Sequence, residues 1–446
     1  MSRAVDAVRT RQFWQQQWVL VALVAIAVVY LGAVTLMHTL ATSPIDEWVY
    51  LDYLFKIPQQ GLVFTGELVG PDTLTLMSCH GTSPFGPIGT PCGETPVPAD
   101  FPNQGLSTAS LNSPIYFYVT FGVGWLISHV LPVGEITGWR LSSLVWVVAG
   151  IVVFIKLLRS WGARDLTIFA LGLAFVASPF AWWTFTYVST DAPLFLSGAL
   201  LFLLATRVVR GEAPGWAFGL VAVLVVLVKS VAIVGVAAAA LYLLAEFVSD
   251  WRRRRLASES RPVAWRLVWV AGAAVAFSLA SAWLWNRLTV VLAISAQGPD
   301  QGIATPLSIS ELLMQMTNFL PQALTASAIN EYTPAFAYAP LGWLTLVCVL
   351  GAAFVATRTD RWVPLVSSVV AAGALAAPAL ALMLVASVGF YYQIPSRYGA
   401  VLLPAFLLCG GLILRNRWVN GAIIAYAVSL LGLGIWLAGY LATLAP

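Results

Sequence analysis

The chain has 446 residues, of which 60% are hydrophobic and only 9% are charged, and its mean hydropathy is +0.85. So little polar surface excludes a soluble globular protein and indicates an integral membrane protein with several spans. The net charge of +4 does not indicate nucleic-acid binding, because most basic residues lie between apolar runs, where the preference for cytoplasmic positive charge accounts for them.

Apolar runs of roughly 17–25 residues recur along the chain, each long enough to cross a hydrocarbon core about 30 Å thick as a helix. The first, residues 18–38, is followed by no small-residue cleavage site, so we expect a retained anchor with a cytoplasmic N-terminus. The sequence predicts a single all-α polytopic membrane domain over residues 1–446 with about eleven transmembrane helices. The other ten are expected at residues 140–157, 166–183, 192–207, 216–228, 231–247, 264–285, 338–356, 363–390, 399–414 and 418–443.

This topology places residues 39–138, the first outer loop, on the outer side. Long loops in compact proteins are usually functional, and this one is acidic, with Lys56 as its only lysine. Within it, residues 115–131 are expected to form an aromatic helix in the outer membrane interface rather than a span. A crossing there would place the basic residues that follow residue 155 outside. Residues 286–337 are expected to form a second outer loop.

Two of the four cysteines, Cys79 and Cys92, lie in the first outer loop. A disulfide between them is expected if the loop faces an oxidising compartment. The three histidines are isolated from one another in the sequence, so no zinc site is predicted.

The side of the membrane assigned to each basic residue shows which of these residues need an explanation. All but five of the 23 basic residues lie at the inner ends of the expected spans, provided that the chain turns at Lys229 rather than continuing as one long helix. The five exceptions are Lys56, Arg140, Lys229, Arg287 and Arg397.

Three of these exceptions, Arg140, Lys229 and Arg397, lie within or at the ends of apolar helices. An unpaired cation there is unfavourable, so each should have an anionic partner, either a protein carboxylate or a ligand phosphate. The planar fork of arginine suits phosphate. For Arg140, a structural pairing with Glu135 or another loop acid is an equal alternative. Asp191 is expected either to cap the helix that begins near Ala192 or to belong to a site.

Short motifs follow one another along roughly residues 40–410, in the order Asp46-Glu47, Asn112-Ser113-Pro114, Arg140-Leu141, Thr190-Asp191, Lys229 and Ser396-Arg397-Tyr398. The order of these motifs and the side of the membrane assigned to each resemble those of the polyprenyl-phosphate-sugar-dependent glycosyltransferases of the GT-C superfold. They also resemble a related group of uncharacterised bacterial multi-pass membrane proteins.

The resemblance implies that Asp46 is the base that activates the acceptor and that Glu47 supports it or the acceptor. The chemistry agrees, since displacing a lipid phosphate from a sugar needs a carboxylate for the hydroxyl proton and cations for the leaving phosphate. Arg397, Lys229 and Arg140 are the candidates for binding the donor phosphate. The other site candidates are Asp191, Tyr50 and Tyr398, where Tyr50 stands in place of a histidine found in many relatives.

The implied enzyme is a hexosyl- or pentosyltransferase in the cell membrane with its site on the outer face. Its donor would be a polyprenyl-phosphate-linked sugar and its acceptor an envelope glycan, a lipid or a protein. A single base predicts inversion at the anomeric carbon, whereas retention would require a second carboxylate such as Asp191 as nucleophile. A divalent cation stays open as a cofactor.

Two other classes of function fit the same residues. A transporter or flippase of a lipid-linked or anionic solute would also need intramembrane cations, although the sequence shows no clear repeated halves. An envelope glycan polymerase or ligase would share the lipid-phosphate leaving group. A non-catalytic membrane partner on the same scaffold is a further alternative.

Overall fold

The structure is a computed structural model that describes residues 2–257, 264–295, 304–326, 335–357 and 361–444. In these ranges the chain is helical from α1 (Ser2–Met37) to α17 (Arg417–Leu444), and extended segments pair only as isolated β-bridges. The predicted fold class, an all-α polytopic membrane protein, is therefore confirmed.

Nine helices in the described ranges are long and apolar enough to cross a membrane. A tenth crossing is formed if α6 (Asp165–Val176) and α7 (Pro179–Thr186), which are bent by 61° at the break between them, make one span. The expected eleventh, α9 (Gly215–Val228), is helical but has only 14 residues, so the count of eleven stays a prediction. The nine are the Gln17–Met37 part of α1, α5 (Glu135–Ser160), α8 (Pro193–Arg210), α10 (Ile233–Ala257), α11 (Arg266–Val291), α14 (Ala335–Ala356), α15 (Val363–Val388), the 3-10 turn η6 (Ser396–Leu402) with α16 (Leu403–Ile413), and α17.

The chain turns at Lys229, as the charge pattern required. The backbone of Lys229 is extended, with φ of −149° and ψ of 115°, and the 3-10 turn η4 (Ser230–Ala232) follows before α10. The Lys229 side chain lies 3.6 Å from Asp191, which directly precedes α8. Helix α9 therefore ends where α8 begins, so the chain returns across the bundle despite the shortness of α9.

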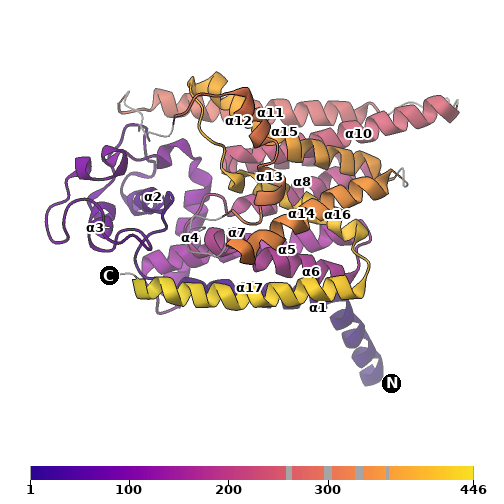
Figure 1. Cartoon of the computed structure of the whole chain (residues 1–446), viewed down its shortest axis with the longest axis horizontal. Coiled ribbons are helices and arrows are strands. Elements are labelled where there is room, and N and C mark those ends of the chain that lie inside the picture. Colours follow the sequence, from indigo (N-terminus) through magenta and orange to yellow (C-terminus); the bar gives the residue numbers. More distant parts are fainter. Residues whose placement is uncertain (1, 258–263, 296–303, 327–334, 358–360, 445–446) are drawn as a thin grey trace.

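The long helices lie side by side along the longest axis of the molecule, and the segment that contains α2 and α3 lies beyond one end of them (Figure 1). The two termini lie at opposite ends of the bundle (Figure 1). The end of α10, which carries Arg252 to Arg255, lies at the end of the bundle away from α2 and α3. Segments assigned to opposite sides of the membrane are therefore at opposite ends of the structure.

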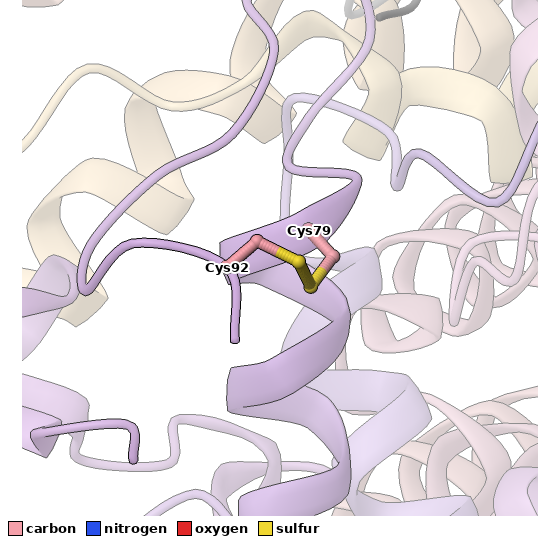
Figure 2. The surroundings of a disulfide bond; sticks show 2 residues. All are labelled: Cys79 and Cys92. Atoms are coloured by element: carbon pink, nitrogen blue, oxygen red, sulfur yellow. A yellow bond between two sulfur atoms is a disulfide. The ribbon is translucent and has the colours of Figure 1, made fainter. Parts of the chain in front are cut away.

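The first outer loop contains α2 (Glu47–Gln60), α3 (Pro71–Cys79) and three short 3-10 turns, η1 (Pro98–Asp100), η2 (Pro102–Gly105) and η3 (Ala109–Leu111). Cys79 and Cys92 are joined by a disulfide in the structure (Figure 2). The segment closed by this bond pairs with the residues that lead to Asp46, since Ser83 N donates to Thr42 O at 2.8 Å. The disulfide therefore closes a segment that supports the start of α2.

The expected interfacial helix at residues 115–131 is α4 (Pro114–Val130), which packs along α5. Two glycines permit this contact, because a Cβ added to Gly138 would lie 2.6 Å from Gly124 O. Tyr118 and Trp125 on α4 remain exposed. The pairing brings Asn112, just before α4, to the same end of the bundle as Lys229, with which it shares a hydrogen bond.

The second outer loop is connected to the segment that precedes Arg397. It contains α12 (Ile309–Gln315) and α13 (Phe319–Gln322), and its residues 296–303 and 327–334 lie outside the described residues. Asn318 Nδ2 donates to Ile394 O at 2.6 Å, and Thr305 N donates to Tyr391 O at 2.7 Å. The described part of this loop therefore fixes the approach of the chain to Arg397.

Candidate active site

Four charged residues that are distant in sequence form one cluster. Arg397 Nε lies 3.0 Å from Asp191 Oδ2, and Arg397 Nη2 lies 3.5 Å from Asp46 Oδ2. Lys229 Nζ lies 3.6 Å from Asp191 Oδ1. Two carboxylates thus face two cations, which is how charges are tolerated in a protein this apolar.

Three members of the cluster lie at helix starts. Asp191 precedes α8, which has Pro193 in its first turn; Lys229 precedes η4 and α10; and Arg397 lies in the first turn of η6 before α16. A helix N-terminus carries partial positive charge and unpaired backbone N–H groups. The N-terminus of α8 and the two side-chain cations together make this position suited to an anion.

Asp46 presents the accessible carboxylate of the cluster. Its backbone is left-handed, with φ of 59°, which is uncommon for a non-glycine residue and often found at functional sites. Its side chain is 36% exposed, compared with 4% for that of Asp191. Its contacts with Tyr50 Oη at 3.4 Å and Arg397 at 3.5 Å are long, so Asp46 can accept a hydrogen bond from another molecule.

Tyr50 lies beside Asp46 as a neutral donor. Burial, and to a lesser extent the charges of Asp46 and Asp191, raise the pKa of Tyr50 well above its ordinary value. The phenol therefore keeps its proton and donates a hydrogen bond to Asp46 Oδ2.

Aromatic rings hold Arg397 in place. Its guanidinium carbon lies 5.6 Å from the centroid of the Trp183 ring and 5.5 Å from that of Tyr398, which is within the range of cation–π attraction. Tyr398 thus belongs to the surroundings of Arg397. Arg397 Nε lies against Asp191, and Nη2 lies toward Asp46.

Lys229 has a similar set of partners. Its ammonium donates to Thr190 Oγ1 at 2.5 Å and to Asn112 Oδ1 at 3.1 Å, in addition to the Asp191 contact. These partners come from two segments, the turn before α8 and the turn before α4, and Lys229 itself lies in the turn after α9. The lysine therefore connects three segments at this end of the bundle.

Glu47 and Arg140 lie outside this cluster, in contrast to their expected roles in acceptor support and phosphate binding. Arg140 Nε donates to Glu47 Oε1 at 2.9 Å and Arg140 Nη2 to Glu47 Oε2 at 3.0 Å. The remaining guanidinium bonds go to the carbonyl oxygens of Thr39 and Ala41. The side chains are 1% and 0% exposed, so the structure favours the alternative in which Arg140 pairs with a loop acid, and this acid is Glu47.

The pair holds the backbone around Asp46. Glu47 also accepts hydrogen bonds from Ser43 N at 2.7 Å and Val188 N at 2.9 Å. It therefore connects the turn before Asp46 to the segment that leads to Asp191. Of the two roles predicted for Glu47, these contacts favour support of Asp46 over contact with the acceptor.

Three residues that contact the cluster were given no role of their own from the sequence: Asn112, Thr190 and Trp183. Asn112 and Thr190 lie within two of the motifs that carry the resemblance, but an uncharged side chain beside a charged one carries little signal of its own. Trp183 is one of 19 tryptophans and has no local mark that distinguishes it. The sequence also gives no sign that the side chains of Asp46 and Glu47, which are adjacent in the chain, reach different partners.

Asp46 and Asp191 are the two carboxylates of the cluster that could serve as ligands of a divalent cation. Within the described ranges, no three His, Cys, Asp or Glu side chains are grouped as metal ligands. The carboxylates of Asp46 and Asp191 both face Arg397, whose guanidinium lies between them. In this arrangement the two acids fit an arginine rather than a divalent cation, and we assign no step to a metal.

Neither a family model nor a curated protein matches the chain. Among solved structures, the chain is similar to ArnT from Cupriavidus metallidurans bound to undecaprenyl phosphate, with a TM-score of 0.48 and 17% identity over 92% of this chain and 64% of that one. It is also similar to the oligosaccharyltransferase of Archaeoglobus fulgidus in the apo form, with a TM-score of 0.41 and 14% identity over 96% of this chain and 56% of that one.

A second structure of the archaeal enzyme, tethered to an acceptor peptide that contains the NVT sequon, gives a TM-score of 0.38 and 12% identity, covering 97% of this chain and 55% of that one. The chain spans between 55% and 64% of the length of these solved chains. All three TM-scores are below 0.5, so neither a fold assignment nor a residue role is carried over from these structures.

Proposed function

We propose that this chain is a GT-C-type glycosyltransferase that transfers a sugar from a polyprenyl-phosphate donor to an acceptor on the outer face of the membrane. One observation carries the proposal. An exposed carboxylate, Asp46, lies 3.5 Å from Arg397, at a position where Lys229 and the N-terminus of α8 also favour an anion. A base next to a phosphate-binding site is the pair of functions that this transfer requires.

In the proposed reaction, Arg397 and Lys229 bind the donor phosphate and Asp46 accepts the proton of the acceptor hydroxyl. A bond forms between the acceptor oxygen and the anomeric carbon, while the bond from that carbon to the phosphate oxygen breaks. The leaving polyprenyl phosphate gains a negative charge, which the two cations stabilise. The acceptor is an envelope glycan, a lipid or a protein.

The geometry favours inversion at the anomeric carbon over retention. Retention by double displacement needs a second carboxylate that is free to attack. Asp191 is the nearest such group, but one of its oxygens contacts Arg397 and the other contacts Lys229. We therefore assign Asp191 to holding the two cations, and Asp46 to proton transfer.

The disulfide and the arginine run support the proposed orientation in the membrane. A disulfide in the first outer loop requires an oxidising compartment, and Arg252 to Arg255 at the opposite end are expected to be cytoplasmic. Single cysteines introduced at Glu94 and at Arg253 test this in intact cells, in a background that lacks the native cysteines. A membrane-impermeant maleimide is expected to label position 94 and not position 253. Labelling of position 253 before lysis would contradict the orientation.

Binding of undecaprenyl phosphate tests the anion site. Arg397→Gln removes a charge-assisted contact and is expected to weaken binding about 10- to 100-fold, since hydrogen bonds to charged groups contribute about 1.5–3 kcal/mol. Arg287→Gln is the matched control, because Arg287 is an exposed outer cation that contacts Trp283 and lies outside the cluster. Equal affinity of Arg397→Gln and wild type would contradict the phosphate assignment.

A transfer assay separates the proposed enzyme from a transporter. Wild-type protein in proteoliposomes is supplied with polyprenyl-phosphate-linked sugars and candidate acceptors, and the products are analysed by mass spectrometry. A glycosyltransferase yields a glycosylated acceptor and free polyprenyl phosphate, whereas a flippase yields movement of an unaltered lipid. Movement without any transferred sugar would contradict the proposed function.

A further inference from the structure

A directional chain of hydrogen bonds connects the lysine of the anion site to Asp46. Lys229 Nζ donates to Thr190 Oγ1, which donates to Tyr50 Oη at 3.2 Å. Tyr50 Oη in turn donates to Asp46 Oδ2 at 3.4 Å. An ammonium group can only donate and a carboxylate can only accept, so the two ends fix the direction of both hydroxyl groups between them.

The hydroxyl of Thr190 has no evident role in holding the local backbone. The turn before α8 is held by Ser189, whose Oγ accepts from Asp191 N and whose carbonyl oxygen accepts from Ala192 N. Within the described part of the chain, Thr190 Oγ1 makes hydrogen bonds to Lys229 and Tyr50. Thr190 is also buried. Its hydroxyl therefore serves the connection between two side chains rather than a helix cap.

We propose that Thr190 and Tyr50 are positioning residues that couple the donor-phosphate site to the base. This inference rests on the proposed function. Tyr50 holds Oδ2 of Asp46, which leaves Oδ1 for the acceptor hydroxyl, and a hydrogen bond donated to a carboxylate favours its ionised form. Thr190 fixes the orientation of the Tyr50 hydroxyl against the ammonium of Lys229, which itself contacts the phosphate.

The coupling predicts that loss of these hydrogen bonds lowers turnover more than it lowers the affinity for the donor. Tyr50→Phe removes one hydroxyl and keeps the ring, and it is expected to lower kcat about tenfold, the scale of one hydrogen bond to a charged group. Thr190→Val keeps the shape and is expected to lower kcat severalfold. In both variants the affinity for undecaprenyl phosphate should stay within about threefold of wild type, because Lys229 and Arg397 remain.

Three comparisons separate coupling from a general structural defect. Thr190→Ser restores the hydroxyl and should turn over close to the wild-type rate. Thr184→Val is the matched control, because Thr184 is buried on α7 and its hydroxyl has no hydrogen-bond partner in the described part of the structure. This variant should behave as wild type. The third comparison sets kcat against donor affinity: in Tyr50→Phe kcat should fall while the affinity stays near that of wild type, and in Thr184→Val both should stay unchanged.

The double variant Tyr50→Phe/Thr190→Val gives the decisive result. If both residues act through one chain, the double variant should be no slower than Tyr50→Phe by more than about twofold. Multiplied effects, or a Thr190→Val variant with wild-type kcat, would overturn the coupling. If Tyr50→Phe does not fold, the difference in kcat between Thr190→Val and Thr190→Ser still tests the coupling. Absence of transfer by the wild type would instead reject the proposed function.

Discussion

Asp46→Asn is expected to lower the rate of sugar transfer by about 100-fold or more, the usual scale for loss of a general base. The amide has the size of the carboxylate and can still accept a hydrogen bond through its oxygen, but it cannot take up the acceptor proton. Asparagine also tolerates the left-handed backbone found at Asp46. The loss should therefore lie in the chemical step and not in folding.

The affinity for undecaprenyl phosphate provides the internal check on this variant. Asp46 makes one long contact with Arg397, so its neutralisation leaves the phosphate-binding cations in place, and donor affinity should be unchanged or slightly higher. Asp72→Asn is the matched control, because Asp72 is an exposed acid in the first turn of α3 within the same loop. Near-normal transfer by Asp46→Asn would show that another group is the base, with Asp191 the next to examine.

The cluster itself could be predicted in part because charge is rare in this chain. A cation in an apolar helix requires a partner, and this requirement, together with the side of the membrane assigned to each charge, selects Arg140, Lys229 and Arg397 from among 23 basic residues. Two of these three belong to the cluster. The requirement does not say which acid pairs with which base. Arg397 and Asp46 are 351 residues apart, and only the packing of η6 against the outer ends of the other helices brings them together.

The separate roles of Asp46 and Glu47 could not be predicted from their positions in the sequence. Adjacent acids appear as one motif, but Asp46 is the left-handed residue before α2 and Glu47 is the first residue of that helix. The change in backbone conformation between them sends the two side chains to different places. One reaches the exposed cluster, and the other reaches the buried Arg140.

The number of transmembrane spans shows a different limit of prediction from the sequence. Apolar runs give the segments that form helices, since all eleven expected runs are helical, but length alone does not say whether a 14-residue helix such as α9 crosses the bilayer. The turn at Lys229 was predicted from charge sidedness, because a continuous helix would have placed the arginine run of α10 outside. The bend between α6 and α7 was not predicted, although Pro179 at the start of α7 is the residue that ends a helix in this way.

Glu47→Gln is expected to lower the free energy of unfolding by about 3–5 kcal/mol, the range for removing one partner of a buried ion pair. Each carboxylate oxygen of Glu47 accepts one bond from Arg140 and one from a backbone N–H. A glutamine must place its NH₂ group at one of these positions, where it faces two donors, and Arg140 is left as an unneutralised buried cation. Titration with SDS in mixed micelles measures the loss.

Glu135→Gln is the matched control, because Glu135 is an exposed acid in the first turn of α5, the helix that carries Arg140. Its unfolding free energy should match that of wild type. The double variant Glu47→Gln/Arg140→Gln should be less destabilised than the sum of the two single variants, since residues of one ion pair are coupled. Glu47→Gln should also lower transfer, because the turn that presents Asp46 loosens, whereas Asp46→Asn lowers transfer without loss of stability. A Glu47→Gln variant that unfolds like wild type but has lost transfer would show instead that Glu47 acts in the reaction itself.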